Sequence, residues 1–96
     1  MRAHLRFHVK NKIAGRYVME LSIFEVDDSD RYPLRIKYGL VFHDLETKKI
    51  LLFDNHHPKG PHIHINKVEF GYEYLSDEKL IEDFSELVFQ EFGVKL

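Results

Sequence analysis

The chain has 96 residues, of which 44% are hydrophobic, and its formal net charge is −2. This length fits a single domain over residues 1–96, and the absence of cysteine excludes disulfide bonds, thiolate metal sites and a cysteine nucleophile. The first ten residues lack the apolar run of a signal peptide, and no segment approaches a membrane span. We therefore expect a soluble, cytoplasmic protein without a membrane partner.

Much of the chain alternates between apolar and polar side chains, which is the period of a strand with one buried face. In the first such segment Ala3, Leu5, Phe7 and Val9 share one face, and basic or histidine side chains share the other. Turn-forming residues separate the alternating segments, as at Gly15. We expect strands over residues 3–10, 16–26, 34–43, 49–53 and 67–74.

Residues 76–93 form the one segment with helical periodicity. Ser76 is placed to cap the N-terminus of this helix, and Gly93 is placed to end it. The predicted fold class is α+β, a meander-like antiparallel sheet of about five strands with this helix packed on its apolar face. The apolar stripe of the helix consists of Leu80, Ile81, Phe84, Leu87, Val88 and Phe92.

Basic and acidic side chains gather at opposite ends of the sequence. Residues 1–16 carry five basic side chains and no acid, whereas residues 76–93 carry six acids and one lysine. If strands 3–10 and 34–43 lie near each other, their polar faces form a cationic surface suited to a polyanion. The alternative is that both segments simply solvate exposed faces. The side chains of the expected surface are His4, Arg6, His8, Lys10, Arg35, Lys37 and His43.

Four of the seven histidines lie in the segment NHHPKGPHIH, residues 55–64. Its proline and glycine residues predict a loop without regular structure. Three interpretations of its histidines compete: a metal site, an acid–base site, and an exposed turn that is rich in histidine. Loops carry functional sites more often than the elements they connect, which favours a functional interpretation.

A metal site would use imidazole and carboxylate ligands from this loop. In an extended segment His62 and His64 project to the same side, and His56, His57 or Asp54 would complete a set suited to zinc or another first-row metal. The spacing HHxxxxHxH matches no strong zinc pattern, and there is no HExxH motif. We therefore predict no intrinsic metal and no cofactor, and a metal-dependent hydrolase is kept as an alternative.

Acid–base chemistry fits the composition of the loop better. Cleavage of RNA without a metal needs a base for the 2′-hydroxyl, an acid for the departing 5′ oxygen, and cations for the charge that develops on the phosphate. Histidine titrates near neutral pH and can serve as acid or base. Lys59 supplies a cation, and Gly60 lets backbone amides approach a phosphate closely.

The segment LLFDNHHPKGPHIH, followed by KVEFGYEYLSDEKLIEDFSELV, resembles the TumE-like toxin family of bacterial and archaeal toxin–antitoxin modules. Members of that family carry a Tyr- or Phe-Asp-Asn segment that leads into a Lys-Gly-x-His-x-His motif. They close with an aromatic-rich strand and a helix of the type LxxDFxxxV. The matching residues are Phe53, Asp54, Asn55, Lys59, Gly60, His62 and His64, and in the helix Leu80, Asp83 and Phe84.

The resemblance implies a type II toxin that acts on RNA and is silenced by a helix-turn-helix antitoxin. It carries over Asp54, Asn55, Lys59, His62 and His64 as functional residues. Combined with the loop chemistry, it leads to the hypothesis of a metal-independent ribonuclease. His62 and His64 would be its acid and base in either order, Lys59 would stabilise the phosphorane, and Asp54 would orient an imidazole.

Other basic and histidine side chains would hold the RNA substrate. Two alternatives stay open, a metal-dependent hydrolase that uses the same histidines and a non-catalytic module whose loop docks a protein. A homodimer and a toxin–antitoxin hetero-oligomer are both compatible with the sequence. The residues expected to bind RNA are His56, His57, Arg6, Arg35 and Lys37.

Overall fold

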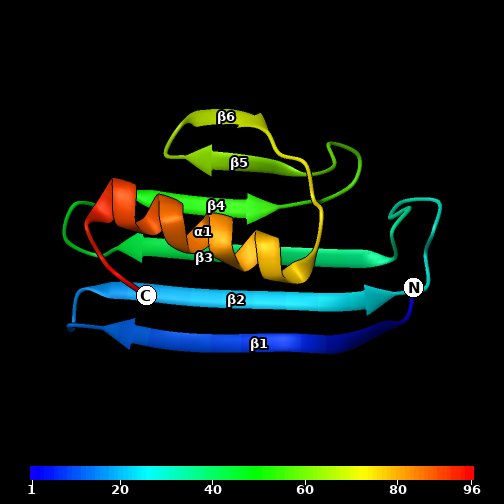
Figure 1. Ribbon diagram of the computed structural model, residues 1–96, viewed down its shortest axis with the longest axis horizontal. Coiled ribbons are helices and arrows are strands. Elements are labelled where there is room, and N and C mark those ends of the chain that lie inside the picture. Colours follow the sequence, from blue (N-terminus) through cyan, green and yellow to red (C-terminus); the bar gives the residue numbers. More distant parts are fainter.

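The computed structural model describes all residues, 1–96, as one antiparallel sheet and one helix (Figure 1). The elements are β1 (Ala3–Ile13), β2 (Tyr17–Val26), β3 (Ile36–Asp44), β4 (Ile50–Asp54), β5 (His62–Ile65), β6 (Val68–Gly71) and α1 (Asp77–Phe92). The strands lie side by side in chain order from β1 to β6, so the sheet is a meander. The predicted α+β class is confirmed, with six strands where about five were expected.

Helix α1 begins and ends where its capping residues predict. The hydroxyl oxygen of Ser76 accepts a hydrogen bond from the N–H of Lys79 at 3.0 Å, which satisfies one of the free N–H groups of the first turn. Gly93 has a φ of 69°, in the left-handed region, and its N–H donates to the carbonyl of Phe89 at 2.9 Å. The helix does not have the length and apolar character that crossing a membrane requires.

The apolar stripe of α1 packs on one face of the sheet. Leu80, Phe84 and Val88 are fully buried, and the ring of Phe84 meets that of Phe53 edge-on, with 5.6 Å between centroids. Figure 1 shows the helix lying across the middle of the sheet, with β1 and β6 outside its cover. The sheet contributes to this core Met19, Leu21, Ile23, Tyr38, Leu40, Phe42, Leu51, Phe53 and Ile63.

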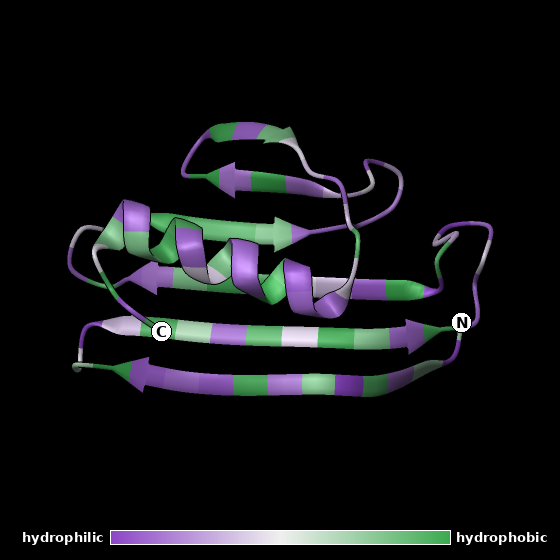
Figure 2. Cartoon of the chain, in the orientation of Figure 1, coloured by the Kyte–Doolittle hydropathy of each residue, from purple (hydrophilic) through white to green (hydrophobic).

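The other face of the sheet, which we call the open face, carries no helix. It is hollowed at Gly39, which stands in register between Ser22 of β2 and Asp54 of β4. A Cβ at Gly39 would have no atom within 4 Å, so the missing side chain leaves open space. The hollow has a volume of about 400 Å³. Figure 2 shows β4 as hydrophobic along most of its length. Both of its faces carry apolar side chains, since Leu51 belongs to the core under the helix and Leu52 lines the hollow.

A β-bulge in β1 breaks the expected cationic surface. The register between β1 and β2 shifts around Arg6, which turns to the helix side and forms an ion pair with Asp77 at 3.0 Å. Strand β2 separates β1 from β3, and its Glu20 accepts a hydrogen bond from His8 at 3.0 Å. The condition for one cationic surface, that the two basic strands lie near each other, is therefore not met.

Several predicted boundaries also differ from the structure, and β1 continues to Ile13 where the strand was expected to end at residue 10. The strand expected over 34–43 starts at Ile36, because Arg35 has a φ of 58° and interrupts the extended chain. The loop expected over 55–64 contains the first residues of β5. The strand expected over 67–74 is only β6, which follows a tight turn at Asn66, where φ is 53°.

An ion pair between Arg16 and the buried Asp44 fixes the turn between β3 and β4. Asp44 is 4% exposed, and its two carboxylate oxygens accept hydrogen bonds from Nε and Nη2 of Arg16 at 3.0 and 2.9 Å. The N–H groups of Glu46 and Thr47 donate to the same carboxylate. The hydrogen bonds from Arg16 hold the pKa of Asp44 well below its usual value, so this carboxylate stays charged in acid solution. The turn that follows β3 is thereby tied to Arg16, the residue directly before β2.

Candidate functional site

The loop between β4 and β5 returns the chain to Asp54. The N–H of Gly60 donates to the carbonyl of His56 at 3.2 Å, and Gly60 has a φ of 75°, which glycine adopts without strain. Strand β5 then pairs antiparallel with β4 and places His62 opposite Asp54. Because alternate residues of a strand face the same side, the imidazoles of His62 and His64 both lie on the open face.

Five polar side chains meet at this place, from β4, the loop, β5 and β6. Glu69 joins from β6, where it stands in register opposite His64. We call the group the histidine–carboxylate cluster. Its members are Asp54, Lys59, His62, His64 and Glu69.

His62 is the most constrained member of the cluster. Its side chain is 8% exposed, its Nε2 lies 2.9 Å from Oδ1 of Asp54, and its Nδ1 lies 2.6 Å from the carbonyl oxygen of Gly60. A carbonyl oxygen only accepts hydrogen bonds, so Nδ1 carries a hydrogen. Protonation of Nε2 as well would satisfy both contacts. The contact of Asp54 with an imidazole, which was expected from the sequence, is present.

Glu69 connects Lys59 with the two imidazoles. Nζ of Lys59 lies 3.0 Å from each carboxylate oxygen of Glu69, and these oxygens lie 3.9 Å from Nε2 of His62 and from Nδ1 of His64. The hydrogen bond from Lys59 lowers the pKa of Glu69. The ring of His64 stands edge-on to that of His62, with 4.6 Å between centroids, and is 26% exposed. The imidazole of His62 is thus buried and held by two contacts, whereas that of His64 is partly exposed.

The structure brings together four of the five residues expected to be catalytic, and Asn55 is the exception. Its side-chain oxygen accepts a hydrogen bond from the N–H of Tyr38 at 2.9 Å, and its amide donates to the carbonyl of Ile36 at 2.7 Å. The Asn55 side chain thus bonds to backbone groups of β3 directly beyond the last paired residues of β3 and β4. Asn55 therefore fixes where the loop begins, and its amide does not face the cluster.

The five residues expected to bind RNA are scattered. Lys37 and His56 line the hollow of the open face, next to Asp54. Arg6 lies on the helix side, whereas Arg35 and His57 are exposed in the turns before β3 and after β4. The surface that could hold a substrate beside the cluster is therefore narrower than the sequence predicts.

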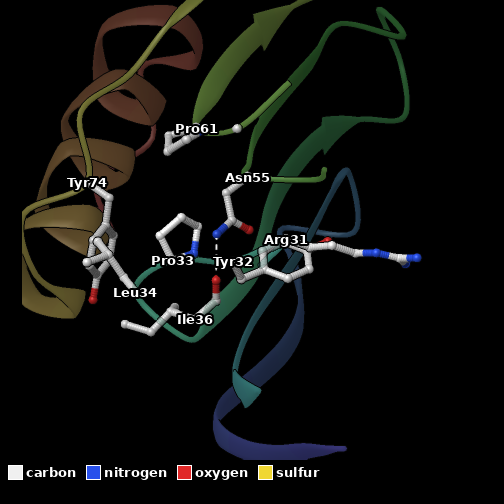
Figure 3. A pocket seen from close by; sticks show the side chains of 9 residues that line it. Arg31, Tyr32, Pro33, Leu34, Ile36, Asn55, Pro61 and Tyr74 are labelled. Atoms are coloured by element: carbon white, nitrogen blue, oxygen red, sulfur yellow. Dashed lines mark hydrogen bonds between the residues drawn. The ribbon is translucent and has the colours of Figure 1, made fainter. Parts of the chain in front are cut away.

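A smaller cavity of about 190 Å³ lies on the other side of the loop (Figure 3). Figure 3 shows Asn55 at its centre, bonded to the backbone of Ile36, with Tyr74 and Pro61 on its walls. Burial and a hydrogen bond to Asp77 raise the pKa of the Tyr74 hydroxyl to about 12. The remaining lining residues are Arg31, Tyr32, Pro33, Leu34 and Gly60.

Glu69 and Tyr38 were not predicted from the sequence as residues near the site. If β5 had been predicted as a strand, the two-residue turn at 66–67 would have indicated that Glu69 stands opposite His64. The hydroxyl of Tyr38 is buried without a hydrogen-bond partner, and burial together with the charge of Asp54 raises its pKa. No signal in the sequence distinguishes Tyr38 from the other core aromatic residues.

Three side chains of the cluster have the identity and spacing of metal ligands. One ligand atom each from Asp54, His62 and His64 lie within 4.8 Å of one another. Comparison of the chain with protein-family models, curated proteins and solved structures finds no match. The resemblance to TumE-like toxins thus rests on the motif residues, and the chemistry of the cluster rests on its geometry.

Proposed function

We propose that this chain is the toxin of a type II toxin–antitoxin module of the TumE-like kind, and that it cleaves RNA in the cytoplasm without a metal ion. The observation that carries the proposal is the pairing of two neighbouring imidazoles with a lysine on one sheet face, one imidazole held by Asp54 and the other partly exposed. Histidine pairs of this kind supply the acid and the base that RNA cleavage needs.

The proposed reaction transfers two protons. His64, the more exposed imidazole, takes the proton of the 2′-hydroxyl, and the 2′ oxygen attacks phosphorus. The bond from phosphorus to the 5′ oxygen breaks, and His62 gives the Nε2 proton to that oxygen. The products are a 2′,3′-cyclic phosphate and a 5′-hydroxyl. Asp54 orients His62 before the reaction, and Lys59, which is 61% exposed, can leave Glu69 to contact the phosphate.

The hollow of the open face is the proposed path of the RNA beside the cluster. It begins at Asp54 and is lined by Lys37 and His56 as well as by Glu20, so Lys37 is the cation that a phosphate beside the cluster would contact there. A helix-turn-helix antitoxin that covers this face would silence the toxin in a hetero-oligomer. The antitoxin and the RNA would then bind the same face and compete for it.

Incubation of the purified chain with mixed cellular RNA tests the proposal. We expect fragments with 2′,3′-cyclic phosphate and 5′-hydroxyl ends, formed equally well with and without EDTA, because the two imidazoles need no metal to move the protons. Fragment sizes and end groups are measured together. Cleavage abolished by EDTA would overturn the metal-independent chemistry. RNA that stays intact under both conditions would overturn the ribonuclease function and favour the alternative of a loop that only binds a protein.

Filling the hollow is expected to impair cleavage without unfolding the chain. In Gly39→Val the new side chain enters open space on a strand, where valine is favoured, and narrows the path beside Asp54. We expect KM for an RNA oligonucleotide to rise about tenfold, with kcat reduced less, because the loss is mainly one of binding. Steady-state kinetics and the thermal unfolding midpoint are measured together. An unchanged KM in a folded variant would exclude the hollow as the substrate path.

A further inference from the structure

We propose that Asp54, His62 and His64 form a binding site for a first-row divalent cation, for which Zn²⁺ is the best match, and that this cation inhibits RNA cleavage by occupying the same side chains. The binding site rests on geometry alone. The inhibition rests also on the proposed ribonuclease function. The sequence raised these three residues among the possible ligands but led us to predict no intrinsic metal, because the spacing does not show that Asp54 lies opposite His62 on the adjacent strand.

The distances between the three ligand atoms are close to those of an occupied site. Bonds of about 2.0–2.2 Å from zinc to nitrogen and oxygen put neighbouring ligands of a tetrahedral site roughly 3.3–3.6 Å apart. The three atoms lie within 4.8 Å of one another, and Nε2 of His62 lies 2.9 Å from Oδ1 of Asp54. Small side-chain rotations therefore suffice to place all three around one ion.

The backbone holds these side chains in place before any ion arrives. His62 and His64 are alternate residues of β5 and face the same side, and Asp54 stands opposite His62 on the adjacent strand. Sites built on strands are positioned more firmly than sites built on loops. The rigidity of the paired strands reduces the ordering that binding would otherwise require.

The carbonyl of Gly60 gives His62 the orientation that metal-binding histidines usually have. Such histidines donate their second ring N–H to a carboxylate or a backbone carbonyl, which fixes the tautomer and aims the other nitrogen at the metal. Here Nδ1 of His62 contacts the Gly60 carbonyl oxygen at 2.6 Å, so Nε2 is the nitrogen that faces Asp54. This supporting contact is independent of the distances between the ligands.

The surroundings favour a cation with affinity for nitrogen. Asp54 and Glu69 place two carboxylates beside the imidazoles, against one lysine, and both oxygens of Glu69 lie 3.9 Å from a ring nitrogen. Glu69 or a water molecule would fill a fourth position. Two imidazoles and a carboxylate suit zinc and its first-row neighbours, whereas Mg²⁺ and Ca²⁺ prefer ligands that are all oxygen.

Binding of the cation and transfer of protons exclude each other at these residues. A ring nitrogen whose lone pair is bound to zinc neither takes the proton of a 2′-hydroxyl nor gives one to a departing 5′ oxygen. The apo chain is therefore the active form of the proposed ribonuclease. Free zinc, or a cation of similar preference, becomes its inhibitor.

Titration of the metal-free chain with Zn²⁺ in a calorimeter tests the site. We expect one ion bound per chain, and at least about tenfold weaker binding in His64→Gln and in Asp54→Asn. His4→Gln is the matched control, because His4 is an exposed histidine on β1, away from the cluster, and we expect it to bind as the original chain does. The His64 and Asp54 side chains are only partly buried, and circular dichroism verifies that each variant is folded.

The same preparations are then assayed for RNA cleavage at increasing Zn²⁺ concentration. Inhibition that follows the calorimetric binding curve and is reversed by EDTA supports the proposal. Zinc binding that is absent, or is unaffected by the Asp54 and His64 substitutions, overturns the site. Site-specific binding that accelerates cleavage overturns the inhibition. If no preparation cleaves RNA, the ribonuclease function and the inhibition fail, and the calorimetry alone decides whether the metal site exists.

Discussion

The His62→Ala and His64→Ala variants are each expected to cleave RNA roughly 10²–10⁴-fold more slowly than the original chain. The reason is that each substitution removes one of the two groups that transfer a proton in the proposed reaction. The two groups act in one step, so the double variant should cleave RNA only slightly more slowly than the slower of the two single variants. The measurement is kcat/KM on a short RNA oligonucleotide, determined for the three variants under identical conditions.

Two controls separate a catalytic effect from a general one. His4→Ala alters an exposed histidine of β1, and its cleavage rate should match that of the original chain. Because His62 is buried, each variant is also tested for binding to the antitoxin and for its thermal unfolding midpoint. If folded His62→Ala and His64→Ala retain the original rate, the cluster is not the site of cleavage.

Phe84→Ala is expected to lower the free energy of unfolding by about 3–5 kcal/mol. Phe84 is fully buried on α1, and its ring contacts Phe53 of β4 edge-on, so the truncation leaves a cavity between helix and sheet. A small domain has roughly 5–15 kcal/mol of stability in total, so this single change removes a large part of it. Urea denaturation followed by circular dichroism measures the difference.

Phe89→Ala is the matched control for this prediction. It makes the same change five residues further along the helix, where the side chain is 57% exposed. Its effect should stay within about 0.5 kcal/mol, because a substitution at an exposed position removes little buried area. Equal destabilisation by the two variants would contradict the packing of α1 on the sheet.

Periodic patterns explain why most of the fold could be predicted from the sequence. The helix follows from its stripe of apolar residues and from the caps Ser76 and Gly93, and β1 to β4 follow from alternation or from a short apolar run. Strand β5 was missed because its four residues lie directly after Pro61, and turn-forming residues outweighed the short alternation His-Ile-His-Ile. The bulge at Arg6 leaves no mark in the pattern of alternation.

The sequence allowed most residues of the candidate site to be identified, but only part of their arrangement in space. The histidines, Asp54 and Lys59 were identified because few other roles suit such a combination of side chains in one segment. The place of Glu69 depends on the register between β5 and β6, which cannot be inferred before β5 is known. The role of Asn55 depends on backbone groups of β3, which are distant in sequence.

The meander places the whole cluster in one continuous segment, residues 54–69, folded as two successive hairpins. Each hairpin closes a short loop, so the entropy lost in bringing the functional groups together is small. Distant parts of the chain contribute the supporting strands and the covering helix but none of the five side chains. An exchange of genetic material that moved this segment onto another antiparallel sheet would therefore transfer the chemistry with it.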